Sequence, residues 1–282
     1  MRALVPSHIT GFFSAKLQED PMKSGSIGCG ITLSLGASTT VDHADKTEIF
    51  LNGKLSDAPV SRYVVDTLSK SPVRVQTRLD MPLGSGFGAS GAGALGCAYA
   101  LNADFELGRT ANQAAAVAHV AEVICRTGLG DVIAQNFGGL VLRLSAGAPG
   151  IAKIDRIPMP PTKIDFVVRG PMSTKEVLSD PDIMKAINRE GMANLKELLK
   201  RPTLKNFMNL SRRFTIRIGL ASNWILEAMD AVDAVGGLAS MVMLGDAVFA
   251  LGNSQTHEAL REFGDVGTTY VSQKGANLDK DS

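Results

Sequence analysis

A glycine-rich segment at residues 82–93 has the composition of a loop that binds an anion through its backbone. It reads Pro-Leu-Gly-Ser-Gly-Phe-Gly-Ala-Ser-Gly-Ala-Gly, with five glycines, two serines and little side-chain bulk. Glycine inside a helix or strand costs about 0.5–1 kcal/mol relative to alanine, so such a run indicates close approach of bare backbone to another group. Backbone N–H groups ahead of a helix bind phosphate. The segment therefore predicts a phosphate-binding loop.

A hydroxyl and two carboxylates, those of Ser90, Glu122 and Asp131, could complete a nucleotide site around that loop. Glu122 falls within residues 110–127, whose alanine-rich pattern and capping residues predict a helix. Asp131 follows two glycines, which set it at a turn. A site for Mg·ATP needs few protein oxygens, because phosphates and waters supply the remaining ligands. The three side chains are therefore candidates for metal binding and catalysis.

The segments on either side of the loop predict a strand before it and a helix after it. Residues 73–79 largely alternate apolar and polar side chains, as in a half-buried strand, and residues 92–101 are rich in alanine and leucine, as in a packed helix. A helix N-terminus offers unpaired N–H groups and a partial positive charge. Because both elements abut the glycines directly, a phosphate loop explains the segment better than a flexible linker does.

Two other kinds of phosphate loop compete for the same segment. A Walker loop needs a lysine, and the chain has none in residues 71–152, which excludes it. The spacing G-x-G-x-x-G over residues 86–91 formally fits a dinucleotide fingerprint, with Asp104 and Glu106 near the expected acidic position. That fit is weak because the segment does not open a β-α-β unit and the acidic residues lie in a polar loop.

The remaining pattern predicts an α+β chain with a boundary in the proline-rich residues 145–161. Expected early strands are 3–5, 27–41 and 46–51, with the last two paired. In the second half we expect one helix over roughly 211–235 and antiparallel strands at 238–244 and 247–251. Gly245 and Asp246 between these strands suit a two-residue hairpin turn.

Composition limits the class of protein. The chain has 282 residues, is 45% hydrophobic and has a formal net charge of +1, so it has no electrostatic signature of nucleic-acid binding. Its three cysteines lack C-x-x-C spacing and fit reduced thiols rather than disulfides or zinc ligands. With no signal peptide and no apolar run of about 18 residues, we expect a cytoplasmic protein without a membrane span. Segments rich in methionine and alanine favour a homodimer.

These motifs resemble those of the GHMP kinases, which include galactose, homoserine, mevalonate and phosphomevalonate kinases. The glycine loop is similar to the family's P-x-x-x-G-L-G-S-S-A-A. Glu122, followed by Gly-Leu-Gly-Asp at 128–131 and two glycines at 138–139, is similar to the middle of mevalonate-type enzymes. The opening Val-Pro-Ser-His-Ile-Thr-Gly-Phe-Phe at 5–13 looks like the family's A-P-G-K-x-x-L-x-G-E, with His8 where the family often has lysine.

Three segments look like the archaeal pantoate kinase branch of that family. They are residues 5–13, the Gly-Ser-x-Gly-x-Gly at 25–30 and the Ala-Ser-Met-Val-Met-Leu-Gly at 239–245. The last segment stands where the family usually has a third motif of consecutive glycines. The resemblance covers nearly the whole chain.

The resemblance implies a two-domain α+β GHMP-kinase fold. The expected domains are an N-terminal ribosomal-protein-S5-like, ATP-binding domain at 1–150 and a C-terminal ferredoxin-like α+β domain at 151–282. It also implies ATP and Mg²⁺ as cofactors and phosphorylation of the primary hydroxyl of pantoate to 4-phosphopantoate in coenzyme A biosynthesis.

The family's motifs assign roles to individual positions of this chain. Ser90 and Glu122 match the metal ligands, and Asp131 matches the catalytic aspartate that faces the acceptor hydroxyl. The expected ATP-binding residues are those of the loop: Pro82, Gly84, Ser85, Gly86, Phe87, Gly88, Ala89 and Ser90.

An acceptor with a carboxylate needs an arginine or N–H groups, and Arg143 is the predicted partner. Four more residues are predicted to bind the acceptor: His8, Ser26, His119 and Thr174. Plainer roles stay open. Arg143 could be a solvated strand residue, His119 a packed histidine, and Ser26 and Thr174 turn and cap residues.

Plainer roles also remain for the two carboxylates, and other functions remain for the chain. Glu122 could form a surface ion pair with Arg126, and Asp131 could stabilise a turn. The alternatives are another small-molecule GHMP kinase of the homoserine or mevalonate type, a non-catalytic nucleotide-binding regulator on this fold and a dinucleotide-dependent oxidoreductase. The intact set of Ser90, Glu122 and Asp131 argues against the regulator.

Overall fold

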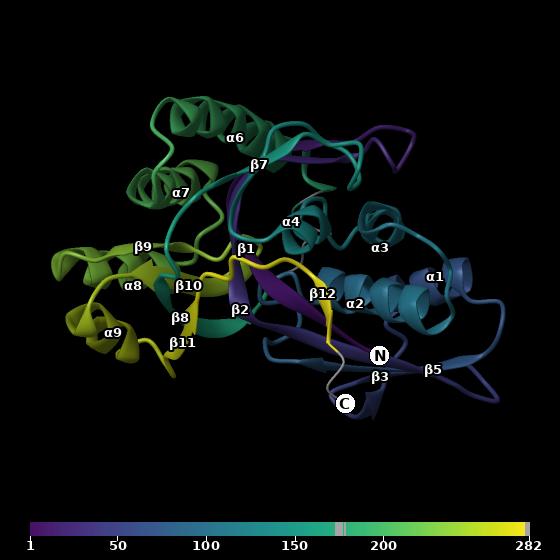
Figure 1. Cartoon of the computed structure of the whole chain (residues 1–282). Coiled ribbons are helices and arrows are strands. Elements are labelled where there is room, and N and C mark those ends of the chain that lie inside the picture. The colour runs from purple at the N-terminus through teal and green to yellow at the C-terminus, as the bar shows by residue number, and fades with distance from the viewer. Residues whose placement is uncertain (173–176, 178, 280–282) are drawn as a thin grey trace.

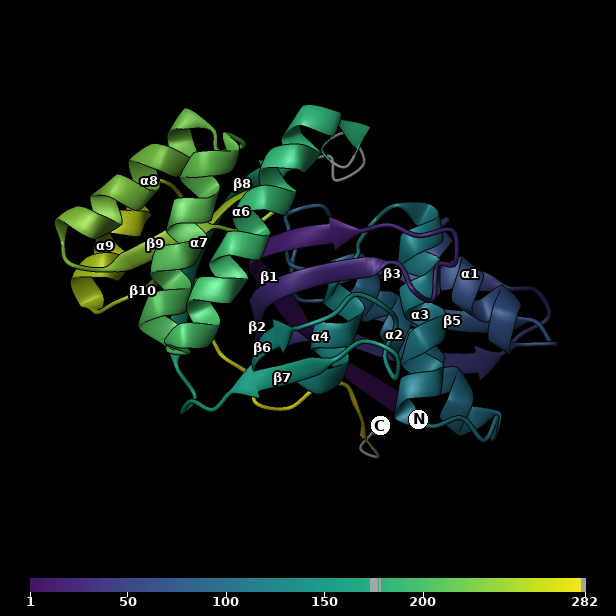
Figure 2. The ribbon, with the colours of Figure 1, turned by 90° about the horizontal axis from the view of Figure 1, so that it is seen from above.

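The structure is a computed structural model that describes residues 1–172, 177 and 179–279. Helices α1, α2 and α3 gather in one lobe and α6 to α9 in the other, with the long strands β1 and β2 running between them (Figures 1 and 2). The helices are α1 (Pro59–Leu68), α2 (Ala89–Asp104), α3 (Ala111–Cys125), α4 (Asp131–Phe137), α6 (Pro181–Lys200), α7 (Leu204–Ile218), α8 (Asn223–Ala234) and α9 (Ser254–Arg261). None of the helices within the described residues is long and apolar enough to cross a bilayer.

The larger sheet is mixed and is built on the β1–β2 hairpin. Its strands are β1 (Arg2–Lys16), β2 (Gly25–His43), β3 (Glu48–Leu51), β4 (Lys54–Leu55), β5 (Val73–Leu79), β6 (Leu140–Arg143), β7 (Ile154–Ile157) and β12 (Asn277–Asp279). The main path runs β12-β1-β2-β5-β3-β4, and β6 pairs with both β2 and β7.

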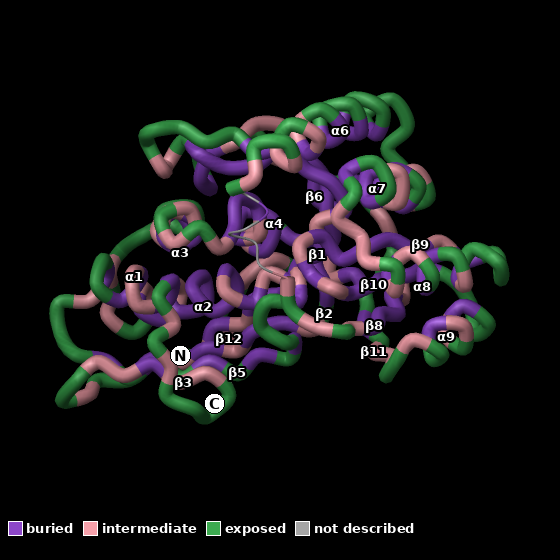
Figure 3. The backbone as a smooth tube through the Cα atoms, turned by 180° about the vertical axis from the view of Figure 1, so that it is seen from behind, coloured by how far each residue is buried: buried purple, intermediate pink, exposed green. Residues whose placement is uncertain are grey.

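Two predictions for these strands were wrong. β1 extends well past the expected residues 3–5, because residues 5–9 and 11–15 are buried without a break, so no alternation of polar side chains marks the strand. Figure 3 shows buried residues along much of β1 and β2, and in β2 the burial is unbroken only over residues 25–33. β3 does not pair with β2: β1 occupies one edge of β2, and β5 and β6 share the other, so β3 lies parallel to β5 instead.

The second sheet is antiparallel and has the order β11-β8-β10-β9. Its strands are β8 (Lys163–Pro171), β9 (Leu238–Met241), β10 (Gly245–Leu251) and β11 (Gly267–Tyr270). With α6–α8 between β8 and β9 and α9 between β10 and β11, this is the β-α-β-β-α-β order of a ferredoxin-like domain. The predicted α+β fold class is confirmed.

Two further boundary predictions in this half were wrong. The expected helix at 211–235 is divided, since Gly219 takes a left-handed conformation (φ 69°) and Ser222 caps a new helix by accepting from the Ile225 N–H. Gly245 and Asp246 belong to β10, and the turn before it lies at residues 242–244.

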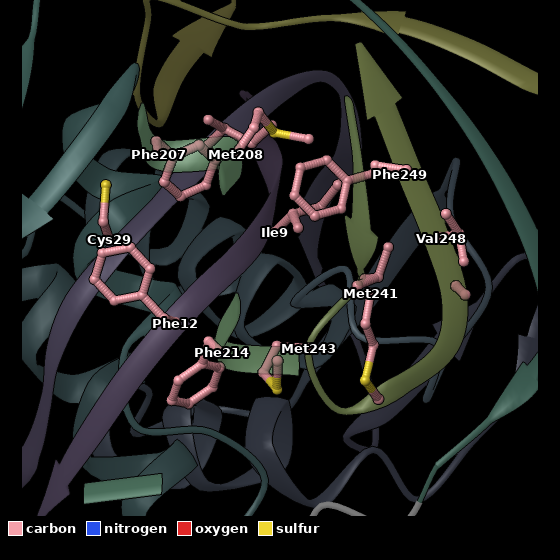
Figure 4. Packing of buried hydrophobic residues seen from close by; sticks show 14 of the residues in the cluster. Ile9, Phe12, Cys29, Phe207, Met208, Phe214, Met241, Met243, Val248 and Phe249 are labelled. Carbon is pink, nitrogen blue, oxygen red and sulfur yellow. The ribbon is translucent and has the colours of Figure 1, made fainter. Parts of the chain in front are cut away.

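The hydrophobic core forms two clusters, of which one has all its buried residues within 3–132 and the other combines strands β1 and β2 with the second half of the chain. Phe12 of β1 packs against Phe207 and Phe214 of α7, with ring centroids 6.2 and 6.4 Å apart (Figure 4). At the other end of the chain, β12 returns to pair with β1. The domain division at residue 150 stays a prediction, and one of the two core clusters extends across it.

Candidate active site

The predicted phosphate loop connects β5 to α2, so the expected order of strand, glycine loop and helix is confirmed. Helix α2 begins at Ala89, directly after Gly88, whose φ of 65° is left-handed. Gly86 also has a positive φ, and a Cβ there would lie 2.7 Å from the carbonyl oxygen of Met243. Glycine is required at this point for both reasons.

The segment at 242–245 packs against the loop. A Cβ on Gly245 would collide with the carbonyl of Ser85. Leu244 has a φ of 64°, an uncommon conformation for a residue with a side chain. Next to Pro171, which pairs with Gly245, the Met172 N–H donates to the Gly84 carbonyl at 3.0 Å. The altered third motif therefore supports the backbone of the phosphate loop.

Ser90 and Glu122 meet at the start of α2. The Ser90 hydroxyl donates to Glu122 Oε1 at 2.7 Å, and the Thr127 hydroxyl donates to the same oxygen at 2.8 Å. Glu122 is 2% exposed, so it is not the surface residue of the ion-pair alternative. Burial, together with the negative charge of Asp131, raises the pKa of Glu122 to about 7, against the effect of the two hydroxyls.

Helix α3 holds Glu122 in place. Thr110 caps the helix by accepting from the Gln113 N–H, and the Gln113 side chain accepts in return from the Thr110 N–H. This capping box fixes the first turn. The helix ends at Arg126, which is left-handed (φ 57°), and the chain turns there toward Thr127. Glu122 thus sits in the last turn of a well-defined helix.

Asp131 does not lie in a simple turn, because it is the first residue of α4. A Cβ on Gly128 would collide with Glu122 Oε2 and lie 3.1 Å from Asp131 Oδ2. A Cβ on Gly88 would likewise lie 3.1 Å from the Asp131 side chain. The phosphate loop and both carboxylates therefore converge, and only glycines fit between them.

This group of oxygens fits a magnesium ion. In the part of the chain that the structure describes, no cluster of three or more His, Cys, Asp or Glu side chains could hold a metal by itself. Mg²⁺ is commonly held by one or two carboxylates together with substrate phosphates and water. The buried carboxylate of Glu122, bonded to two hydroxyls, matches that requirement.

Asp131 is linked through His8 to Arg143. His8 Nδ1 lies 2.7 Å from Asp131 Oδ1, and His8 Nε2 lies 3.3 Å from Arg143 Nη1. Arg143 also donates to the Thr10 hydroxyl at 3.4 Å. His8 is completely buried, whereas the Asp131 side chain is 22% exposed. Burial lowers the pKa of His8 most strongly, while the hydrogen bond and charge of Asp131 act in the opposite direction.

One cavity contains most of the predicted ATP and catalytic residues. The members of the predicted set that line it are Ser26, Gly84, Gly86, Phe87, Gly88, Ala89, Ser90 and Asp131. Pro82 and Ser85 lie outside the lining and shape the turn, since the Ser85 hydroxyl donates to the Pro82 carbonyl at 2.6 Å. Glu122, His8 and Arg143 are in the layer behind it.

The lining also contains residues that the sequence did not single out: Thr10, Phe13, Leu83, residues 127–130, Met243 and Leu244. Thr10 and Phe13 belong to the opening motif, and residues 128–131 to the Gly-Leu-Gly-Asp motif. These two motifs could therefore have identified several of the additional lining residues from the sequence. Met243 is only 3% exposed although it borders the cavity.

Two of the predicted acceptor residues, Ser26 and Arg143, lie close together, whereas His119 has a different partner. A Cβ on Gly130 would lie 2.8 Å from Arg143 Nε and would collide with the Ser26 hydroxyl, so both groups face the same point. Ser26 lies in β2 rather than in a separate turn. His119 Nε2 bonds the Ser24 carbonyl at 2.8 Å, which holds the end of the β1–β2 connection to α3. Thr174 lies outside the described residues.

The comparisons with known proteins agree with this arrangement. The family model of the GHMP kinases N terminal domain matches residues 58–139. A pantoate kinase of Thermococcus kodakarensis is 38% identical, over 93% of this chain and 91% of that protein. A pantoate kinase of Methanocaldococcus jannaschii is 36% identical, over 90% of this chain and 93% of that protein.

A solved structure matches at the level of the fold as well. It is described as a phosphotransferase related to the CoA biosynthesis pathway, and it is 34% identical with a TM-score of 0.89, over 99% of this chain and 98% of that one. Together with the curated relatives, it places this chain in the pantoate kinase family of the GHMP kinases.

Proposed function

We propose that the protein transfers the γ-phosphoryl group of ATP to the primary hydroxyl of pantoate and releases 4-phosphopantoate and ADP. The observation that carries the proposal is the convergence of a glycine phosphate loop, a buried hydroxyl–carboxylate pair and a second carboxylate on one cavity. The full-length similarity to pantoate kinases supports pantoate as the acceptor.

The backbone from Gly84 to Ser90 binds the nucleotide phosphates in this proposal. The first N–H groups of α2 have no partner inside the helix and carry its partial positive charge. Because Gly86 and Gly88 have no side chains, the phosphates can approach these N–H groups directly. The supporting segment at 242–245 keeps the loop in this conformation.

Ser90 and Glu122 would hold Mg²⁺. When bound, the ion would neutralise charge on the transferring phosphoryl group. Among the described residues no cationic side chain is bonded to the carboxylate of Glu122, and Ser90 and Thr127 orient that carboxylate through their hydroxyls. Glu122 must be ionised to bind the metal, so its raised pKa makes metal binding depend on pH near 7.

Asp131 orients the acceptor hydroxyl and accepts its proton. It lines the cavity beside Gly88 of the phosphate loop, so its carboxylate lies next to the site where the phosphates bind. Phosphoryl transfer depends mainly on positioning and charge neutralisation, and a base at this point assists the attack of the hydroxyl.

Ser26 and Arg143 would bind the acceptor's carboxylate. Arg143 Nε is buried, and within the described residues it has no hydrogen-bond partner. That unused donor faces the same point beside Gly130 as the Ser26 hydroxyl. A carboxylate there would complete the hydrogen bonding of the arginine. His119 and Thr174 stay predicted acceptor residues, and the homodimer, the cytoplasmic location and the domain division also stay predictions.

The test is an acceptor panel with purified protein and Mg·ATP. We expect rapid phosphorylation of pantoate and little of homoserine or mevalonate. Faster turnover of either competitor would assign the chain to another GHMP activity. Absence of phosphorylation with every acceptor, despite ATP binding, would favour the regulator, and tight NAD binding would favour the oxidoreductase.

A further inference from the structure

His8 lies in the layer behind the cavity, and each nitrogen of its ring has a hydrogen-bond partner. Its Nδ1 lies 2.7 Å from Asp131 Oδ1, and its Nε2 lies 3.3 Å from Arg143 Nη1. An arginine side chain has only donors, so Nε2 must accept. The proton of a neutral ring then lies on Nδ1 and is donated to Asp131. The geometry therefore defines one tautomer of His8.

We propose that His8 is a positioning residue, whose neutral ring fixes both the catalytic carboxylate of Asp131 and the acceptor-binding guanidinium of Arg143. This inference rests on the roles given to these two residues in the proposed function. His8 itself touches neither substrate. Its effect on the reaction passes through the two groups that it holds.

The surroundings of the ring favour its neutral form. The titratable and charged groups that face it are Asp131 from α4 and Arg143 from β6, and Cys29 of β2 adjoins Arg143. Burial of Cys29 raises the pKa of its thiol, so it adds no negative charge. Burial of the imidazole and the positive charge of Arg143 both oppose protonation of His8. Asp131 alone favours it.

The space around His8 is also limited. A Cβ on Gly30 would collide with His8 Nε2, so β2 packs directly against the ring. The backbone N–H of His8 donates to the carbonyl of Phe87 in the phosphate loop, at 3.0 Å. A lysine at this position, as the similar family motif often has, would place a second cation beside Arg143. A neutral acceptor at Nε2 avoids that repulsion.

Two variants of similar size to histidine test the hydrogen bond to Asp131 and the hydrogen bond to Arg143 separately. His8→Asn keeps a donor near the position of Nδ1, for Asp131, and removes the acceptor for Arg143. His8→Gln places an amide near the position of Nε2, for Arg143, and removes the donor to Asp131. The pair compares the two hydrogen bonds with little change in volume.

We expect His8→Gln to lower kcat by roughly 10–100-fold, the usual effect of losing a group that orients a catalytic residue. Its acceptor KM should rise less than that of His8→Asn, because the amide still faces Arg143. His8→Asn should raise the acceptor KM by about tenfold, the effect of losing one charge-assisted hydrogen bond, and should lower kcat less than His8→Gln does.

The comparison uses whichever acceptor the wild-type enzyme phosphorylates. Preference for an acceptor other than pantoate would overturn the proposed function and still test His8. Equal changes in kcat and in the acceptor KM in the two variants, together with a lower Tm, would show that His8 merely fills space. Nitrogen-15 NMR of the wild-type protein gives a readout free of activity: a neutral His8 protonated at Nδ1 is expected, and an imidazolium or a ring protonated at Nε2 would overturn the proposal.

Discussion

Glu122 and Asp131 approach the same point beside Gly128, yet the protein surrounds these two carboxylates differently. Glu122 is buried and accepts hydrogen bonds from two neutral hydroxyls. Asp131 is partly exposed to the cavity and is backed by an imidazole that an arginine supports. A buried carboxylate without a cation suits a metal ligand. A carboxylate that is open on one side and held on the other suits a base.

Asp131→Ala should have the largest effect, because it removes the base and leaves the phosphate loop intact. We expect kcat to fall by ~10²–10⁴ with little change in the KM for ATP. Steady-state kinetics with saturating Mg·ATP would measure it. Near-full activity would show that Asp131 is not the base. The proposed difference in role between Asp131 and Glu122 would then be wrong.

Glu122→Gln should affect metal binding more than the acid–base step. The amide oxygen can still accept from Ser90, so the local structure is kept, but the charge is lost. We expect the Mg²⁺ concentration for half-maximal rate to rise by roughly 10–100-fold. An unchanged Mg²⁺ requirement, together with a lower kcat, would show that Glu122 acts in proton transfer rather than as a metal ligand.

Gly245→Ala tests the support of the phosphate loop. A Cβ there would collide with the Ser85 carbonyl and displace the loop. Loss of one charge-assisted hydrogen bond to phosphate corresponds to about a tenfold rise in the KM for ATP. Gly170→Ala is the matched control, because its Cβ would meet no atom within 4 Å and its φ is not positive. Equal KM values for the two variants would contradict the supporting role.

The raised pKa of Glu122 predicts a pH dependence of stability in the metal-free protein. Its pKa rises from 4.5 to about 7 on folding, so between these values the folded state binds more protons than the unfolded state. Stability therefore falls as the pH rises through this range. Glu122→Gln removes this loss, so its Tm should exceed that of the wild type at pH 8 but not at pH 4. Parallel Tm curves for the two proteins would show that Glu122 is not destabilised by burial.

Local signals in the sequence predicted much of the site. The strand, glycine loop and helix around Ser90 follow from residue types within about 30 positions, and so does the capped helix that holds Glu122. The glycines before Asp131 indicated a turn, whereas the structure has Asp131 as the first residue of a helix, where it lines the cavity.

The parts that the sequence did not predict depend on distant contacts. His8 and Asp131 are 123 residues apart, and only the packing of β1 against α4 brings them together. The support of the loop by residues 242–245 likewise depends on where the second sheet meets the first lobe. β1 was underestimated because burial on both faces removes the alternation that identifies a strand.

The most direct test of the central claim is phosphorus NMR of the reaction of pantoate with Mg·ATP, run with the wild type and with Asp131→Asn. The wild type should form one phosphomonoester of pantoate for each ADP. Asp131→Asn should bind nucleotide normally and form product at least 100-fold more slowly, as expected for loss of a general base. Release of ADP without a pantoate phosphomonoester, or product formation by the variant at the wild-type rate, would contradict the account.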